Sequence, residues 1–478
     1  MGLDWPTLTP IPWAALGPLV AGLWGSNLAV SGWGPAQQAR FERKMKQSGP
    51  ARSPAHDPAG LGAPPRFASP DEAKAAVQAF DLRRLPAAYY ANPYPYYHAL
   101  REYDPVHRLP DGGYFLSRYA DCVAVYKDAI AFSSDKKREF KPKYGDGLLY
   151  EHHTTSLVFN DPPLHTRVRR IIAGAFTPRA IADMERSVVR LVDDLIDAIA
   201  AKGSADLIAD LAGAVPVEVI GNLLAVPREE RGPLRAWSLA ILGALEPVLT
   251  DEQRERGERA VAAFVAYLER LVTDRRQHPG DPERDVLTRL IQGEQDGERL
   301  SERELLHNII FILNAGHETT TNLIGNGLYA LLEWPEEKAR LIARPELIRT
   351  AVEEFLRFES SNQLGNRMTT RAVEIGGVAM PAGTFITIGI GAANRDPAEF
   401  ADPDRLDVGR EPNRHLAFGS GPHVCIGLNV ARLEGRVAIE RFLARFPDYR
   451  PAGEPVRGGR ARFRGFLSIP VELGCRAR

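Results

Sequence analysis

The sequence has only three cysteines among its 478 residues, Cys122, Cys425 and Cys475, and they lie far apart. An odd number of widely spaced cysteines excludes a disulfide framework and a CxxC metal site. So few thiols fit a reducing environment, and we expect a cytoplasmic protein.

An excess of charge of one sign is also missing. The chain has 60 Lys and Arg residues against 61 Asp and Glu residues, which gives a net charge of −1. Nucleic-acid-binding proteins need a surplus of basic groups against the phosphates, so we expect no nucleic-acid partner.

The chain lacks an unbroken membrane-spanning segment. Residues 11–30 are apolar and uncharged, but prolines and glycines interrupt them, and a bilayer requires about 20 apolar residues. Basic residues follow this segment, whereas a secretory signal carries its positive charge in front. Residues 48–66 are rich in Pro, Gly and Ala, which is typical of a linker. We therefore predict an N-terminal extension over residues 1–74, with membrane contact through residues 11–30 as the disfavoured alternative, and one main domain over residues 75–478.

Common cofactor motifs are incomplete. No Rossmann fingerprint occurs, and Gly419-Ser420-Gly421 begins a GxGxxG pattern in which Val424 replaces the third glycine. His317-Glu318 begins a zinc-protease pattern, but Thr321 stands where its second histidine would be. The sequence therefore indicates no nicotinamide, phosphate or zinc site, and His317-Glu318 alone is typical of an ordinary buried or solvated pair.

One predicted helix is unusually long. It begins at the capping box Ser301–Glu304, ends at Trp334 and spans about 50 Å. Its residues are apolar on almost all sides, which predicts burial on most sides. Gly316 and Thr319-Thr320-Thr321 are poor helix formers in its middle, where a glycine costs about 1 kcal/mol relative to alanine. We infer that function selected them, and that a threonine hydroxyl bonds to the carbonyl four residues earlier.

The remaining pattern is mainly helical with small β-sheets. Residues 179–200 and 255–276 carry apolar residues at helical spacing. Residues 104–118 contain an Asp-Gly-Gly turn before a strand-like segment, and residues 373–391 combine β-formers with turns. A further amphipathic helix is predicted from Leu428.

The segment from Arg414 to Gly427, RHLAFGSGPHVCIG, places Cys425 directly before that helix. Glycine permits positive φ and a close approach of the backbone to a ligand. The positive end of a helix dipole lowers the pKa of a thiol and stabilises the thiolate. From these features alone, Cys425 is either an ordinary buried cysteine in a turn or an anionic sulfur presented to a large, flat ligand.

The segment from Phe418 to Gly427 resembles the cysteine-ligand loop of the cytochrome P-450 haem-thiolate monooxygenases. The family pattern Phe-Gly-x-Gly-x-His/Arg-x-Cys-x-Gly is complete at every specified position. The resemblance covers about residues 75–475 and implies this family's fold, with a long oxygen-binding helix over haem. It also implies that Cys425 is the axial thiolate ligand to the iron of haem b, a ligand that favours O–O cleavage.

Further segments match the same family in the same order. Glu318 and Thr319 resemble its acid–alcohol pair, which supplies protons to dioxygen. Arginine forks pair well with carboxylates, and four basic residues resemble those that bind the haem propionates: His165, Arg169, Arg367 and His423.

Glu354 and Arg357 form an ExxR pattern, in which both residues share one face of a helix. This pattern resembles the family's buried Glu–Arg pair, which holds the approach to the cysteine loop in place. The resemblance implies a third, basic member, and we expect Arg405 in this role rather than Arg410.

The resemblance implies a monooxygenase that inserts one atom of O2 into a hydrophobic small organic substrate. Electrons would come from a ferredoxin or flavodoxin with its reductase, because the chain has no Rossmann motif and too few cysteines for an iron–sulfur cluster. Arg432 and Arg436 would lie on the docking face, with plain solvated charges as the alternative. Segments 83–98 and 231–248 are apolar and aromatic, which favours a hydrophobic substrate.

Two alternatives stay open. A peroxide-driven hydroxylase of this family usually lacks the acid–alcohol pair, which is intact here. A haem-thiolate protein that only binds or senses a ligand would keep Cys425 without turnover. Product formation with NAD(P)H and surrogate redox partners, compared with peroxide alone, separates the three.

Overall fold

The computed structural model describes residues 66–474, apart from 175, 177, 283–284 and 296–297. Cys475 and the apolar segment 11–30 lie outside the described residues, so the predicted extension and its boundary stay a prediction. Among the helices of the described part, none is long and apolar enough to cross a bilayer.

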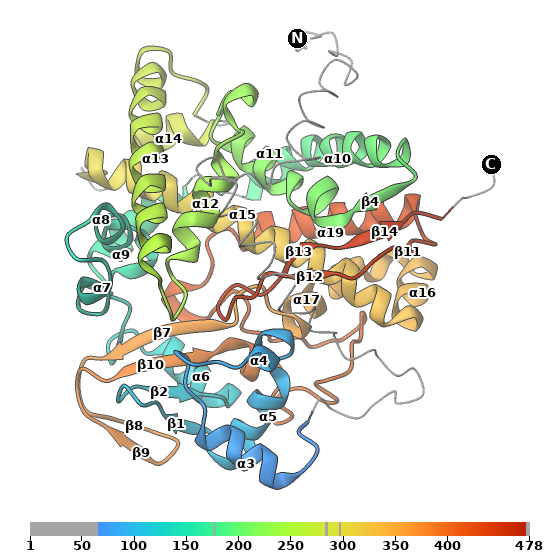
Figure 1. The fold of residues 1–478 in the computed structure, drawn as a ribbon. Helices are drawn as coiled ribbons and strands as arrows, with labels where there is room; N and C mark the ends of the chain where they lie inside the picture. The colour runs from blue at the N-terminus through green and yellow to red at the C-terminus, as the bar shows by residue number, and fades with distance from the viewer. Residues whose placement is uncertain (1–65, 175, 177, 283–284, 296–297, 475–478) are drawn as a thin grey trace, which may run out of the picture. The chain divides into compact units, whose positions relative to one another are not determined.

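Helices dominate the fold, as predicted (Figure 1). They are α3 (Pro70–Gln78), α4 (Ala87–Ala91), α5 (Tyr94–Tyr103), α6 (Tyr119–Lys127), α7 (Lys137–Tyr144), α8 (Leu148–Thr155), α9 (Leu164–Ala173), α10 (Pro178–Ala200), α11 (Ala214–Leu223), α12 (Leu234–Gly243), α13 (Asp251–Gln277), α14 (Val286–Gln292), α15 (Glu302–Glu333), α16 (Pro335–Ala343), α17 (Ile348–Phe358), α18 (Ile390–Ala393) and α19 (Leu428–Arg445). Short helical turns are η3 (Leu157–Phe159), η4 (Leu207–Ala212), η5 (Arg228–Glu230), η6 (Pro345–Leu347) and η7 (Gly421–His423).

The strands are short and form small sheets, also as predicted. One five-stranded sheet has the order β1-β2-β10-β7-β3, in which only β10 and β2 are parallel. Figure 1 shows this sheet on the side of the molecule that carries α3–α6. The strands are β1 (Val106–Arg108), β2 (Tyr114–Leu116), β3 (Phe132–Ser133), β4 (Ser204–Asp206), β5 (Glu294–Gln295), β6 (Glu298–Arg299), β7 (Leu364–Thr369), β8 (Val373–Ile375), β9 (Val378–Met380), β10 (Phe385–Gly389), β11 (Arg450–Pro451), β12 (Val456–Arg457), β13 (Phe466–Ser468) and β14 (Pro470–Glu472).

Helix α15 begins and ends where the sequence predicts. Ser301 is its N-cap, and its hydroxyl accepts from the Glu304 N–H while the Glu304 carboxylate accepts from the Ser301 N–H at 2.9 Å. This reciprocal pairing satisfies two backbone donors that a helix start leaves free. Trp334 is the C-cap.

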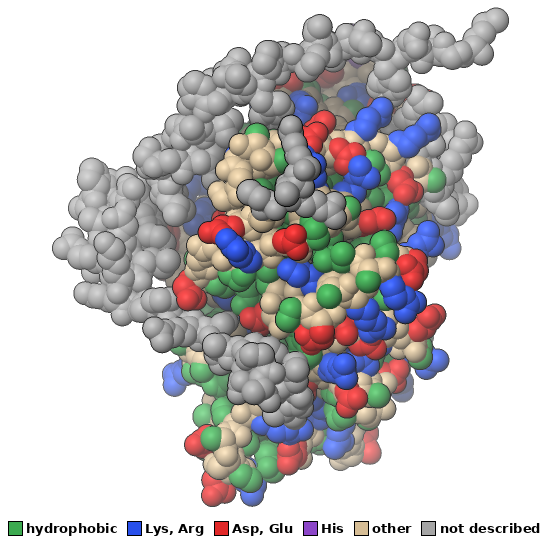
Figure 2. Space-filling view, turned by 90° about the vertical axis from the view of Figure 1, so that its right-hand side faces the viewer, with side chains coloured by type: hydrophobic (Ala, Val, Ile, Leu, Met, Phe, Trp, Pro, Cys, Tyr) green, Lys and Arg blue, Asp and Glu red, His purple; other side chains and the backbone are tan. Residues whose placement is uncertain are grey.

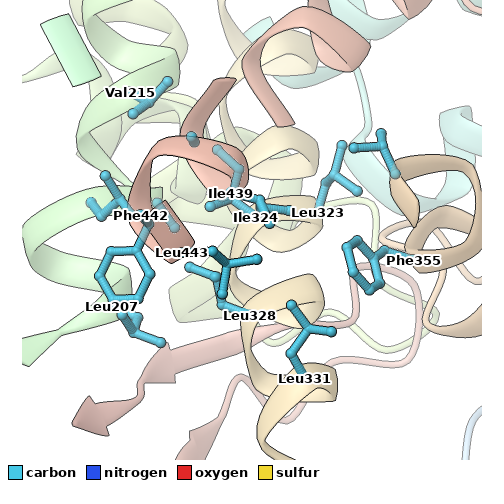
Figure 3. Packing of buried hydrophobic residues seen from close by; sticks show 14 of the residues in the cluster. Leu207, Val215, Leu323, Ile324, Leu328, Leu331, Phe355, Ile439, Phe442 and Leu443 are labelled. Carbon is cyan, nitrogen blue, oxygen red and sulfur yellow. The ribbon is translucent and has the colours of Figure 1, made fainter. Parts of the chain in front are cut away.

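The two halves of α15 belong to two different parts of the hydrophobic core. Its N-terminal half, from Leu305 to Leu313, packs with residues of α8, α12 and α13. Its C-terminal half, from Leu323 to Leu331, packs with α10, α17 and α19, as Figure 3 shows for Leu328, Phe355 and Ile439. The poor helix formers in the middle therefore lie between two well-packed ends, which hold them in position.

Candidate active site

The segment before α19 is a closed loop. The Cys425 N–H donates to the Phe418 carbonyl at 2.9 Å, and the Val424 N–H donates to the Gly421 carbonyl at 3.0 Å. Gly421 has a φ of 69°, and a Cβ there would collide with the carbonyl oxygen of Tyr126. Only glycine combines positive φ with so close an approach, so this residue fixes the position of Cys425.

A cavity of about 340 Å³ is lined by this loop and by the middle of α15. Such a volume is within the usual range of small-molecule sites. Most of its lining side chains are apolar, among them Phe140, Leu157, Ile220, Ile241, Phe311 and Phe463.

The structure brings six of the seven predicted site residues to this cavity. Cys425 and His423 come from the loop, His165 and Arg169 from α9, Arg367 from β7 and Thr319 from α15. Glu318, the seventh, is buried next to Thr319 on α15 and is not among the residues that line the cavity.

The four basic residues form a cluster without a carboxylate partner among the described residues. The rings of His165 and His423 lie 3.9 Å apart, and His165 makes no side-chain hydrogen bond there. Arg169 and Arg367 donate to backbone carbonyls, at 2.7 and 2.8 Å. Burial, together with the neighbouring arginines, lowers the pKa of His165 to about 4 and that of His423 to about 3. Such a cluster has unused N–H donors for an anionic ligand.

The threonine hydroxyl behaves as predicted. The Thr319 hydroxyl donates to the Ala315 carbonyl at 2.7 Å, and α15 stays helical through this turn. A Cβ on Gly316 would approach Ile220 Cδ1 to 2.6 Å, so the glycine permits the close packing of α11 against α15. Thr319 lines the cavity. Because the hydroxyl proton is used in this bond, the Thr319 oxygen can only accept a hydrogen bond from a group in the cavity.

Glu318 forms an ion pair with Arg460, a residue that the sequence analysis did not single out. Its Oε2 is buried and has no hydrogen-bond partner among the described residues. Burial raises the pKa of Glu318 to about 7, and Arg460 opposes this shift. A carboxyl group with this pKa exchanges protons readily near neutral pH.

Comparison with known proteins decides the family. The family model described as Cytochrome P450 matches residues 236–448. Vitamin D(3) 25-hydroxylase of Pseudonocardia autotrophica is 38% identical over 397 residues, which cover 81% of this chain and 96% of the relative. The chain belongs to the cytochrome P450 family. It is a cytochrome P450 monooxygenase, and its cofactor is haem b.

Further P450 relatives agree along most of the chain. Cytochrome P450 107B1 of Saccharopolyspora erythraea is 39% identical over 346 residues, which cover 71% of this chain and 80% of the relative. The crystal structure of P450BioI in complex with a hexadec-9Z-enoic acid ligated acyl carrier protein superposes with a TM-score of 0.77 at 33% identity and covers 81% of this chain and 100% of that chain. The predicted P450 fold is thereby confirmed.

The cavity of this P450 fits a haem. The unused donors of the basic cluster suit two propionates, because arginine forks and histidine N–H groups pair with carboxylates. Gly427 lines the cavity, and a Cβ there would meet nothing within 4 Å, so the glycine leaves this space open beside Cys425. The residues present are those that a flat, dianionic macrocycle with a sulfur ligand requires.

The expected lowering of the Cys425 pKa is wrong for the protein without iron. Burial raises the pKa of this thiol, and the Gly427 amide, Arg169 and Arg432 oppose it without overcoming it. The helix N-terminus therefore does not ionise the sulfur by itself. A bound metal ion would, since a coordinating thiol loses its proton outright.

The choice of Arg405 as the third member of the Glu354–Arg357 pair is also wrong. Arg357 donates to both carboxylate oxygens of Glu354, at 2.7 and 2.8 Å, and both side chains are fully buried. The side chain that completes the group is Arg410, whose Nε lies 3.1 Å from each of these oxygens. Arg405 is exposed and contributes only its backbone carbonyl, which accepts from Arg357.

Some polar residues of the cavity were missed by sequence reasoning. They are Lys136, Glu139, Asn314, Glu434 and Arg462. Helical spacing could have found Asn314, because it lies on α15 one turn before Glu318. It could also have found Glu434, which lies one turn after the buried Val430 on α19. Lys136 and Arg462 lie between regular elements, so no helical or strand period in the sequence points to them.

Proposed function

We propose that the protein inserts one atom of O2 into a hydrophobic small organic molecule, with electrons from a separate ferredoxin or flavodoxin and its reductase. The observation that carries this proposal is that Cys425 and Thr319 line one largely apolar cavity, with Glu318 directly beside Thr319 on α15. The similarity to a Vitamin D(3) 25-hydroxylase supports an apolar substrate. The scarcity of cysteine supports a reducing, cytoplasmic location.

Each site residue has a role in this proposal. Cys425 would hold the haem iron through its sulfur, and His165, Arg169, Arg367 and His423 would bind the propionates. When bound, haem supplies the iron at which dioxygen is reduced and split. The apolar wall orients the substrate and excludes water, while Thr319 accepts a hydrogen bond in the cavity and the neighbouring Glu318 holds a proton.

A redox partner would approach the face that carries Arg432 and Arg436. Each arginine is already paired within the chain, Arg432 with Glu353 at 2.7 Å and Arg436 with Glu185 at 2.6 Å. An acidic partner would therefore compete with these carboxylates. On the face shown in Figure 2, acidic and basic side chains of the described residues are interspersed, in agreement with the balanced composition.

A comparison of two driving systems tests the reaction. We expect the purified holoenzyme to form hydroxylated product from apolar substrates with NADPH, a surrogate ferredoxin and its reductase. With hydrogen peroxide alone we expect a much lower rate, because the acid–alcohol pair that supplies protons to dioxygen is intact. A higher rate with peroxide would favour the peroxide-driven hydroxylase, and binding without product in either system would favour a sensor.

The pH dependence of turnover tests the proton role of Glu318. Its pKa of about 7 means that the carboxyl is protonated below this pH and ionised above it. We therefore expect turnover to fall as the pH rises through about 7. Since Arg460 lowers the pKa of Glu318, the Arg460→Gln variant should raise this pKa and move the fall upward by about one pH unit.

The control for this experiment is Arg450→Gln, because Arg450 is an exposed partner of Glu472 outside the cavity. Its profile should match the wild type. A fall at the same pH in Arg460→Gln and in wild type, measured as product formed per haem, would show that another group sets the profile.

A further inference from the structure

The fixed charges around the cavity are strongly unbalanced. Among its described lining residues are four basic side chains, Lys136, Arg169, Arg367 and Arg462, and only two carboxyl groups, Glu139 and Glu434. Glu434 is fully buried, its Oε2 has no hydrogen-bond partner among the described residues, and burial raises its pKa well above its ordinary value, which favours the neutral form. One ionised carboxylate therefore faces four cations.

Three of the four cations have an anionic partner once the cofactor is present. The Lys136 ammonium donates to Glu139 at 2.8 Å, which pairs the one ionised carboxylate. In the proposed function, Arg169 and Arg367 pair with the two haem propionates. Among the described residues, Arg462 is then left without a carboxylate that accepts a hydrogen bond from its guanidinium.

Arg462 is held in place by neutral acceptors. Its Nε donates to the Leu245 carbonyl at 3.1 Å, and its two Nη atoms donate to the Leu364 carbonyl at 2.7 Å and to Asn366 Oδ1 at 2.5 Å. No carboxylate of the described chain accepts from this guanidinium. A guanidinium has five N–H donors, so two remain, one on each Nη.

The Glu246 carboxylate lies beside Arg462 but does not accept a hydrogen bond from its guanidinium. The Glu246 carboxylate accepts instead from the backbone amides of Ala461 and Arg462, at 3.0 and 3.1 Å. These bonds tie the segment that carries Arg462 to the end of α12. The guanidinium is thereby fixed before any ligand binds, which reduces the entropy cost of binding.

We propose that Arg462 is a specificity-determining residue that binds the carboxylate of an apolar carboxylic acid substrate. This inference rests on the proposed function and adds a substrate class to it. Two remaining donors on one guanidinium match the two oxygens of a carboxylate, and the apolar wall of the same cavity accommodates the rest of such a molecule. Lys136 adds positive potential, and one of its three N–H donors is occupied by Glu139.

The pKa of Lys143, which lies near Arg462, agrees with a surplus of positive charge around Arg462. Burial, followed by the charge of Arg462, lowers the pKa of Lys143 to about 8, although Glu139 and Glu246 oppose this shift. The Lys143 ammonium donates to the Glu246 backbone carbonyl at 2.7 Å rather than to a carboxylate. An added anion would relieve this repulsion.

Substrate titrations of the holoenzyme test the proposal. The probes are matched pairs of a carboxylic acid and its methyl ester with a straight-chain, an aromatic and a polycyclic body, for example dodecanoic acid and methyl dodecanoate. Binding is read from the Soret shift that follows displacement of water, and from equilibrium dialysis. In at least one pair, wild type should bind the acid about tenfold or more tightly than the ester, which is typical of one charged hydrogen-bonded contact.

The variants assign this preference to Arg462. Arg462→Gln should weaken binding of that acid about tenfold or more and leave the ester unchanged, whereas Arg462→Lys should keep part of the preference. Arg450→Gln, an exposed site outside the cavity, should behave as wild type. The carbon monoxide spectrum reports haem binding separately, so loss of its thiolate band would count against the proposed function instead.

Three results would overturn the inference. The first is that no acid binds wild type more tightly than its ester, a comparison that needs no variant to fold. The second is that Arg462→Gln weakens acid and ester equally, which indicates lost packing. The third is that this variant loses haem while acid preference persists, which would assign Arg462 to a propionate.

Discussion

Replacing Cys425 with serine is expected to abolish the red-shifted Soret band of the ferrous carbon monoxide complex and all monooxygenase turnover. Serine nearly preserves the volume of the side chain, and the loop is held by backbone bonds, such as that from the Cys425 N–H to Phe418. The shape of the site should therefore survive. The thiolate, which gives P450 iron its reactivity, is lost, and a hydroxyl is a poor replacement because it does not ionise near neutral pH.

Cys122→Ser is the matched control. Cys122 is fully buried in another part of the core, where its thiol donates to the Leu116 carbonyl at 3.7 Å, and it does not line the cavity. A serine can keep this bond, so spectrum and turnover should be retained. A Cys425→Ser protein that kept the red-shifted band, or a folded Cys122→Ser protein that lost it, would contradict the assignment of the ligand.

The thiol pKa adds a second test of this ligand. Burial raises the pKa of Cys425 in the absence of iron, so the apoprotein should hold a protonated sulfur at neutral pH. Binding of haem should then release a proton, because metal ligands must be deprotonated. The Cys425→Ser protein should release fewer protons on haem binding in a weakly buffered titration.

Short sequence patterns were sufficient to predict the start of α15, the position of the Cys425 loop and the hydrogen bond of Thr319. The capping box at Ser301 fixed the start of α15, because cap and first turn lie within four residues. The glycine pattern placed the Cys425 loop before α19, since positive φ at Gly419 and Gly421 is a local demand of the backbone. The hydrogen bond of Thr319 could be predicted for the same reason.

Features that depend on tertiary packing could not be predicted. Glu318 and Arg460 are 142 positions apart, and no spacing rule joins them. The sign of the Cys425 pKa shift depends on how deeply the folded chain buries the sulfur. Arg405 and Arg410 lie in one irregular segment without a helical or strand period, so the sequence alone could not tell which side chain turns inward.

Replacing Arg357 with leucine is expected to lower the free energy of unfolding by about 3–5 kcal/mol, because it leaves the fully buried Glu354 carboxylate without its main partner. It also removes the bonds from Arg357 to the carbonyls of Asn394 and Pro403, at 2.8 and 2.7 Å. Asn394 in turn accepts from the Leu416 N–H at 2.7 Å, so this network leads to the cysteine loop. We therefore expect reduced haem retention together with a lower urea midpoint.

The comparison of Arg410→Ala with Arg405→Ala tests whether Arg410, and not Arg405, is the second arginine that bonds to Glu354. Arg410 bonds to both oxygens of Glu354, so its loss should lower the free energy of unfolding by about 1–3 kcal/mol. Arg405 is exposed and takes part only through its backbone, so its truncation should cost less than about 0.5 kcal/mol. Urea unfolding of the wild-type, Arg410→Ala and Arg405→Ala holoenzymes measures the difference. Equal destabilisation by the two alanine variants would mean that the Arg405 side chain reaches Glu354 after all, and that the loop before Cys425 is anchored differently.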